Sequence, residues 1–104
     1  MINLEKQATL KGLLKNNPKV VLYFTAPWCG PCMAIGPMVL KLSKEYKDII
    51  FIKLDVDECD PNCPIDYGVR SIPTIILLNN NIEYIRFIGL TPEQTIKNKL
   101  DELV

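Results

Sequence analysis

Two cysteines, Cys29 and Cys32, stand two residues apart in the stretch VVLYFTAPWCGPC, which covers residues 20–32. A pair at this spacing can exchange a disulfide bond, because the thiolate form of a cysteine attacks a disulfide sulfur. An ordinary thiol is mostly protonated at neutral pH, so the attacking sulfur needs a group that stabilises its negative charge. The chain contains no histidine, and the nearest acidic residue before Cys29 is Glu5. We therefore expect the backbone of a helix N-terminus to stabilise the thiolate.

The residues around this pair predict a strand that leads into a helix. Residues 19–25 are mostly apolar, which is typical of a strand buried on both faces. Apolar residues then recur at helical spacing over 35–46, and Pro31 is tolerated in the first turn of a helix that begins near Cys29. Cys32 would then lie one turn deeper, within reach of a mixed disulfide formed at Cys29.

The remaining segments predict an α/β fold in a single domain, residues 1–104. Pro37 lies inside the helix after the cysteine pair and should kink it. Asn79-Asn80-Asn81 tolerates left-handed turn geometry and predicts a hairpin. Thr91-Pro92-Glu93-Gln94 matches a capping box, with proline at the first helical position. The order of elements predicts a central mixed five-stranded β-sheet flanked by helices on both faces. Besides those above, we expect strands at 2–4, 49–56, 73–78 and 82–88, and a helix at 6–15.

The composition argues against several classes of function. Twelve basic and twelve acidic residues cancel, and no basic stripe alternates with aromatic residues, so we expect no binding to nucleic acid or to an anionic membrane. Residues 20–40 carry no charge, but three prolines and two glycines interrupt them too often for a membrane span. The N-terminal sequence MINLEKQ shows no secretory signal, so we expect a cytoplasmic protein in a reducing environment.

The stretch Trp28-Cys29-Gly30-Pro31-Cys32 resembles the active-site signature of the thioredoxin family. The resemblance extends over essentially the whole chain. Residues 53–57, KLDVD, resemble the third strand of that family, and Pro37 matches its helix-kinking proline. Residues 67–74, YGVRSIPT, resemble the segment that carries the family's cis-proline, and Gly89 matches a glycine beside the substrate groove.

This resemblance implies the thioredoxin fold and a protein-disulfide reductase. Cys29 would be the nucleophile, Cys32 would resolve the mixed disulfide, and the clients would be disulfide-containing proteins. A thioredoxin reductase would recycle the dithiol, so NADPH would enter only indirectly and no cofactor would be bound. We expect a monomer. The residues that the resemblance implies for substrate docking are Trp28, Gly30, Pro31, Ile72, Pro73, Gly89 and Leu90.

The sequence also departs from the family. Tyr23 occupies the position of a buried aspartate that helps to deprotonate the resolving cysteine, and a phenol with a pKa near ~10 is no base at neutral pH. Losing the carboxylate eases ionisation of Cys32 but removes a general base, which could slow resolution by roughly 10–100-fold. Lys53 occupies the position of the lysine that usually pairs with that aspartate in the family. Its side chain either contacts the Tyr23 hydroxyl or extends to solvent, and we favour extension to solvent. Met33 replaces a basic residue, which weakens the steering of acidic substrates.

A second pair of cysteines, Cys59 and Cys63, lies outside the family's core pattern. Asp60-Pro61 could cap a short helix and place both thiols one turn apart on one face. The pair could be inert, could form a strained disulfide or redox switch, or could bind a metal; the inert interpretation is favoured.

Three other functions compete with disulfide reduction. All four cysteines could bind one zinc ion, but the long strand and helix between the two pairs argue against it. The chain could be a non-catalytic subunit of another enzyme. It could also run the same chemistry in reverse as an oxidase or isomerase, although Gly30-Pro31 favours the reducing direction by resemblance.

Overall fold

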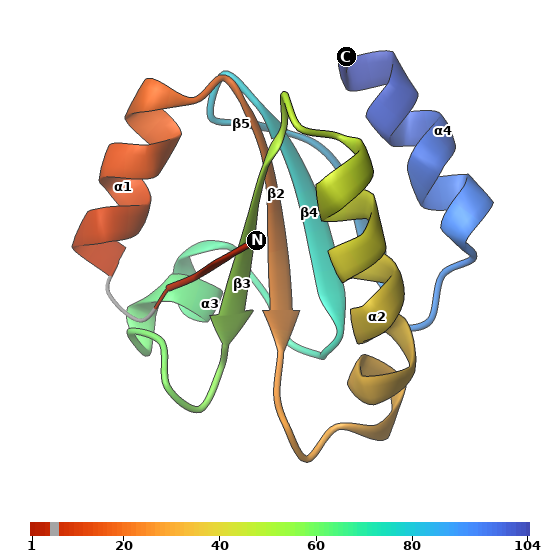
Figure 1. Ribbon diagram of the computed structural model, residues 1–104. Helices are drawn as coiled ribbons and strands as arrows, with labels where there is room; N and C mark the ends of the chain where they lie inside the picture. The colour runs from red at the N-terminus through yellow and green to blue at the C-terminus, as the bar shows by residue number, and fades with distance from the viewer. Residues whose placement is uncertain (5–6) are drawn as a thin grey trace.

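The computed structural model describes residues 1–4 and 7–104, which form five strands and four helices (Figure 1). The first residue of the helix expected over 6–15, Lys6, lies outside the described residues. The strands are β1 (Ile2–Asn3), β2 (Lys19–Thr25), β3 (Ile50–Asp55), β4 (Thr74–Asn79) and β5 (Ile82–Ile88). The helices are α1 (Gln7–Asn16), α2 (Gly30–Glu45), α3 (Asn62–Asp66) and α4 (Glu93–Leu103).

The five strands form one mixed sheet in the order β1-β3-β2-β4-β5. β1, β3 and β2 run parallel, while β4 is antiparallel to β2 and β5 is antiparallel to β4. β2 is therefore central, which agrees with its apolar sequence and with the burial of all but its first residue. The predicted mixed five-stranded sheet is confirmed.

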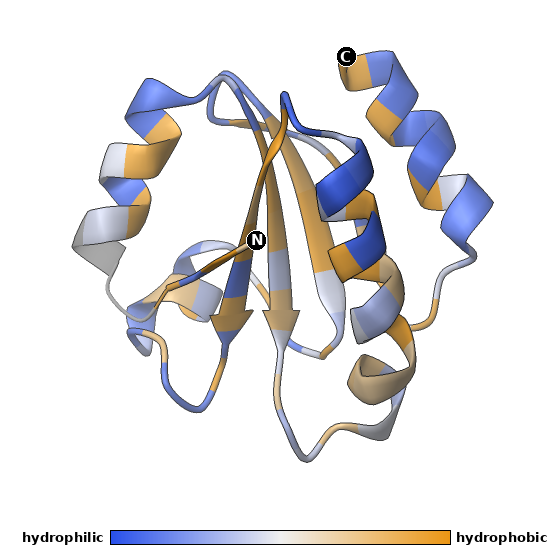
Figure 2. Ribbon diagram, in the orientation of Figure 1, coloured by the Kyte–Doolittle hydropathy of each residue, from blue (hydrophilic) through white to orange (hydrophobic). Residues whose placement is uncertain are grey.

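Alternate residues of the strands point to opposite faces of the sheet and pack into two separate hydrophobic cores. Leu22 and Phe24 of β2 pack into the core covered by α1 and α3, whereas Val21 and Tyr23 pack into the core covered by α2 and α4. Figure 2 shows the apolar residues concentrated in the central strands and on the helix sides that face them. The burial of each large apolar side chain contributes about 1.5–3 kcal/mol, so helices on both faces are required to cover this sheet.

Helix α2 is continuous through Pro37 and buries Ile35, Val39 and Leu42 against the sheet. Its N-cap residue is Cys29, and Pro31 falls in its first turn, as the sequence predicts. The fold therefore starts this helix at the end of a buried strand, directly at the cysteine pair.

The hairpin between β4 and β5 turns on Asn80 and Asn81, whose φ angles are 52° and 63°. Asparagine tolerates this left-handed geometry better than most residues, so the predicted hairpin is confirmed. This turn lies at the opposite end of β4 from Pro73, and hence at the far end of the sheet from the cysteine pair.

The predicted capping box before α4 is wrong. Pro92 has an extended ψ of 142° and occupies the N-cap position, so it is not the first helical residue. The hydroxyl of Thr91 donates to the carbonyl of Gly89 at 3.2 Å and does not cap the helix. Helix α4 is instead fixed by Ile96, Leu100 and Leu103, which are buried against the sheet. None of the helices among the described residues is long and apolar enough to cross a membrane.

Candidate active site at the N-terminus of helix α2

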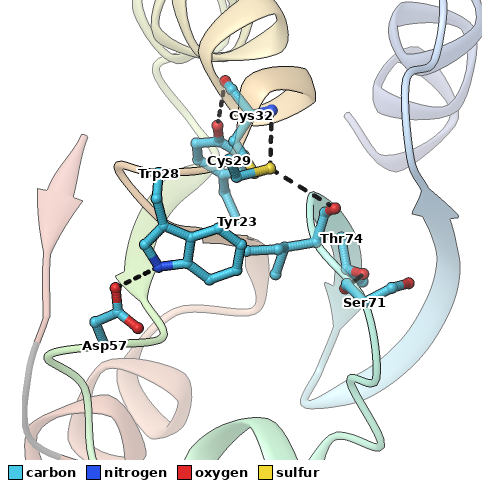
Figure 3. The surroundings of a disulfide bond; sticks show 8 residues. Tyr23, Trp28, Cys29, Cys32, Asp57, Ser71 and Thr74 are labelled. Carbon is cyan, nitrogen blue, oxygen red and sulfur yellow. Dashed lines mark hydrogen bonds between the residues drawn. A yellow bond between two sulfur atoms is a disulfide. The ribbon is translucent and has the colours of Figure 1, made fainter.

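Cys29 and Cys32 form a disulfide bond, and their Cα atoms lie 5.2 Å apart (Figure 3). The backbone N–H of Cys32 donates to the Sγ atom of Cys29 at 3.2 Å. Cys29 thus caps α2 with its sulfur, in the place where an oxygen acceptor usually sits. In the reduced protein, the same N–H and the positive end of the helix would stabilise a thiolate on Cys29.

The two cysteines differ in their access to solvent. Cys29 is 6% exposed and Cys32 is 0% exposed. Both pack against Ala26 in a small apolar cluster that Val56 and Ile72 complete. Of the two cysteines, Cys29 is therefore the one with some exposure to solvent.

The peptide bond between Ile72 and Pro73 is cis, as expected for this segment. The carbonyl oxygen of Ile72 lies 3.8 Å from the Sγ atom of Cys29, so the segment directly faces the disulfide. Pro73 is buried, and its carbonyl accepts the N–H of Gly89 at 2.8 Å. Gly89 has a φ of 81°, a left-handed value that favours glycine at this position.

Sheet topology explains why segments 44 residues apart meet here. β2 and β4 are antiparallel neighbours, with Phe24 opposite Thr74. The chain that leaves β2 towards Cys29 therefore emerges at the same end of the sheet where Pro73 enters β4. The hydroxyl of Thr74 donates to the carbonyl of Ser71 at 2.7 Å and holds the entering segment in place.

The remaining residues predicted for docking differ in their exposure to solvent. Trp28 is 68% exposed and Leu90 is 64% exposed, which are high values for large apolar side chains. Gly30 and Pro31 are exposed in the first turn of α2, whereas Ile72 is half-buried. Two further exposed apolar residues near this end of the fold are Met33 and Ile88.

Asp57 is a residue of the site that the sequence analysis did not single out. Its carboxylate accepts the indole N–H of Trp28 at 2.6 Å (Figure 3), and its own N–H donates to the carboxylate of Asp55 at 2.9 Å. This contact orients an otherwise exposed indole ring. The Asp-Val-Asp sequence after a predicted strand was the available signal, but it does not reveal a partner 29 residues earlier in the chain.

Tyr23 lies beneath the first turn of α2. Its side chain is 2% exposed, and its hydroxyl donates to the carbonyl of Cys32 at 3.2 Å. Burial raises the pKa of Tyr23, and a hydrogen bond with Thr25 offsets this only in part. The phenol is therefore protonated at neutral pH, and it serves as a hydrogen-bond donor here.

Lys53 is the register partner of Tyr23 across β2 and β3, and it is half-buried. Among the described residues, no hydrogen bond or ion pair joins the two side chains. Lys53 is therefore placed beside Tyr23 on the neighbouring strand, without a hydrogen bond to its hydroxyl among the described residues.

The second cysteine pair lies in the core on the other face of the sheet. Cys59 is 5% exposed and Cys63 is 1% exposed, and both are free thiols. The expected short helix is present as α3, with Pro61 at its N-cap; Cys59 lies before this helix, and both thiols pack into the same apolar cluster. Asp60 does accept the N–H of Asn62 at 2.9 Å, as a residue next to a helix start can.

No group of three cysteine, aspartate or glutamate residues in the described part of the chain is arranged to hold a metal ion. The two cysteine pairs also belong to different apolar clusters. The arrangement therefore gives no support to a single zinc site built from all four thiols.

Comparison with known proteins identifies the family. The thioredoxin family model matches residues 1–102. The chain belongs to the thioredoxin family. It is 38% identical over 104 residues to a thioredoxin of Mycoplasmoides gallisepticum, covering 100% of this chain and 99% of that protein. It is 44% identical over 93 residues to the chloroplastic thioredoxin M2 of Arabidopsis thaliana, covering 88% of this chain but 50% of that protein.

The fold comparison agrees with the sequence comparison. The structure of Plasmodium falciparum thioredoxin aligns with a TM-score of 0.91 at 28% identity, and each chain is covered over 100% of its length. With its Cys-x-x-Cys pair, this thioredoxin is a thiol–disulfide oxidoreductase. The predicted fold and class of activity are confirmed.

The buried second pair leads to a prediction about reactivity. Burial and the neighbouring Cys59 raise the pKa of Cys63 to about 12, and burial also raises the pKa of Cys59. Iodoacetamide reacts with the thiolate, and a thiol forms its thiolate only as the pH approaches its pKa. At pH 8, Cys63 should therefore react with iodoacetamide on the order of 10³-fold more slowly than a free thiol. Peptide mass spectrometry of the reduced native protein should therefore show rapid labelling of Cys29 alone.

The same labelling in denaturant is the control, and all four thiols should then react. Early labelling of Cys59 or Cys63 in the native protein at neutral pH would contradict the inert interpretation and would favour the hypothesis that this pair is a redox switch.

Proposed function

We propose that this thioredoxin reduces disulfide bonds in client proteins, with Cys29 as the attacking thiol and Cys32 as the resolving thiol. The observation that carries the proposal is the hydrogen bond from the N–H of Cys32 to the sulfur of Cys29 at the start of α2. It provides stabilisation of a thiolate without any ionisable neighbour, which a chain lacking histidine requires.

The reaction proceeds in two exchanges. The thiolate of Cys29 attacks one sulfur of the client disulfide, whose S–S bond breaks and releases the other client sulfur as a thiolate, which takes a proton from water. Cys32 then loses its proton and attacks the Sγ atom of Cys29, which breaks the mixed disulfide and releases the second client thiolate. The client gains two electrons, and Cys29 and Cys32 are oxidised to a disulfide.

The proposed docking surface consists of the exposed apolar and glycine positions around Cys29. An extended client segment would lie beside the cis-proline segment, where the backbone of Ile72 offers hydrogen-bonding groups. The orientation of Trp28 by Asp57 supports a role in docking rather than in filling the core. The residues assigned to this surface are Trp28, Gly30, Pro31, Ile72, Pro73, Gly89 and Leu90.

A thioredoxin reductase would return the disulfide to the dithiol, with NADPH acting only through that enzyme. We further propose that the protein works as a single domain and a monomer in the cytoplasm, where the free thiols of Cys59 and Cys63 would persist. Some relatives are chloroplastic, so fractionation of the source cells is the direct test of the compartment. Oxidation or isomerisation of disulfides is the alternative function, because the same exchanges run in either direction.

A redox titration distinguishes reduction from oxidation. We expect the Cys29–Cys32 couple to have a reduction potential below that of the cytosolic glutathione pool, which biochemical extraction places at about −220 to −260 mV. A potential of about −270 mV is already known for thioredoxin. The protein would be equilibrated in dithiothreitol buffers, trapped with a thiol reagent and read by peptide mass spectrometry. A couple near the values of about −180 to −120 mV found for oxidising proteins would overturn the reductase proposal.

Serine variants test the two assigned roles. Cys32→Ser should accumulate a mixed disulfide with a client at Cys29, because the attack remains possible and the resolving thiol is absent. Cys29→Ser should form none, because Cys32 is fully buried. Mass spectrometry of the trapped adducts is the measurement, and an adduct at Cys32 in the Cys29→Ser variant would reverse the assignment.

Tyr23→Asp tests the missing base. A carboxylate beneath Cys32 should accelerate the resolving exchange at neutral pH by roughly 10–100-fold, which is below the usual range for a positioned base because the carboxylate also disfavours the thiolate of Cys32. The rate is followed by stopped flow with a chromogenic aryl disulfide, whose second aryl thiolate appears only when Cys32 resolves the adduct.

Tyr23→Phe is the matched control, because it removes the hydroxyl and keeps the ring, and so separates loss of the phenol from gain of the carboxylate. Thermal unfolding must show that each variant is folded, since position 23 is buried. Equal resolving rates for a folded Asp variant and the wild type would mean that this position has no kinetic importance.

A further inference from the structure

A hollow of about 260 Å³ lies beside the disulfide. Its lining is mostly apolar and includes Trp28, Val56, Val69 and Ile72. Ile72 joins the hollow to the reacting sulfur, because its carbonyl oxygen lies 3.8 Å from the Sγ atom of Cys29. A side chain that flanks a client cysteine would therefore enter this hollow while the client sulfur reaches Cys29.

Among the described residues that line this hollow, Arg70 is the charged one. It is exposed, and within the described part of the chain its guanidinium makes no hydrogen bond or ion pair. Arg86 behaves differently, since its guanidinium donates to Glu83 at 2.6 Å and to the carbonyl of Tyr67 at 2.7 Å. Arg70 is thus a cation beside the site whose hydrogen-bonding capacity is available to a ligand.

Asp57 is the acidic residue that contacts Trp28 in the lining of this hollow. The carboxylate of Asp57 binds the indole N–H of Trp28, and Figure 3 shows Asp57 at that end of the ring and Ser71 beyond the other end. Glu58 follows Asp57 directly and is exposed. An acidic client side chain would be repelled from the Asp57 end of the indole and attracted to Arg70, next to Ser71 in the chain.

We propose that Arg70 is a specificity-determining residue that selects client disulfides flanked by an acidic side chain. This inference rests on the proposed function and adds the class of client. Arg70 precedes Ile72 by two residues, so a carboxylate about two residues from the client cysteine is placed to meet the guanidinium, which can bind both carboxylate oxygens. The apolar lining of the hollow accommodates the residue between them.

The expected size of the effect is modest, because the ion pair is exposed. Such pairs change affinity by about two- to fivefold, and salt screens them over roughly 8 Å at physiological ionic strength and 3 Å at 1 M. The acidic preference should therefore shrink at high salt, whereas a preference due to shape alone should remain.

The test uses short cystine-bridged peptides that differ only in having Glu or Gln two residues from the cysteine, on either side. Wild-type protein, reduced beforehand, should reduce the better-placed Glu peptide about two- to fivefold faster than its Gln counterpart, measured as initial release of peptide thiols. Arg70→Gln should bring this ratio to about one, and Arg70→Lys should restore part of it.

Lys15→Gln is the matched control for loss of a positive charge, because Lys15 lies near Asn80 at the far end of the sheet. It should leave the ratio unchanged. An unchanged ratio in Arg70→Gln, or equal rates for both wild-type reactions, would overturn the inference while leaving disulfide reduction intact. If the wild type reduced neither peptide, the proposed function would fail as well.

Discussion

The hydrogen bond between the N–H of Cys32 and the sulfur of Cys29 is the interaction around which the site is organised. It exists because α2 begins at the residue after Cys29, with the first turn left free of competing side-chain caps. The strand before it is buried on both faces and cannot shift its register without moving every apolar side chain to the wrong core. The chemistry of one sulfur is therefore fixed by the packing of the central strand.

The same constraint brings the cis-proline segment to the disulfide. Because β4 is antiparallel to β2, the start of β4 and the end of β2 share one edge of the sheet, and the cis peptide at Pro73 meets Cys29 there. Gly89 follows β5, and its N–H donates to the carbonyl of Pro73. The end of β5 is therefore held beside the start of β4, near the disulfide. Three segments distant in sequence thus form one surface without any of them needing to be flexible.

The sequence allowed the central strand, the hairpin and the start of α2 to be predicted, because these depend on local apolar periodicity, asparagine turn geometry and proline. It did not reveal the bond between Trp28 and Asp57, since a surface aspartate carries no local sign of its distant partner. It misplaced the start of α4, because the Thr91 hydroxyl found a carbonyl acceptor in Gly89 instead of a helix N–H. It indicated the short helix after Asp60-Pro61, because proline favours a helix start, but not the free state of the two thiols beside it.

The different environments of the two cysteines account for the order of the proposed exchanges. Cys29 has a hydrogen-bond donor aimed at its sulfur and is slightly exposed to solvent, whereas Cys32 is fully buried. The hydroxyl of Tyr23 reaches this region but bonds to the carbonyl of Cys32, so it steadies the backbone and takes no proton from the thiol. Cys32 therefore acts second, once attack at Cys29 has placed an electrophilic sulfur within its reach. In the proposed mechanism the backbone would activate the first thiol, and enclosure would delay the second.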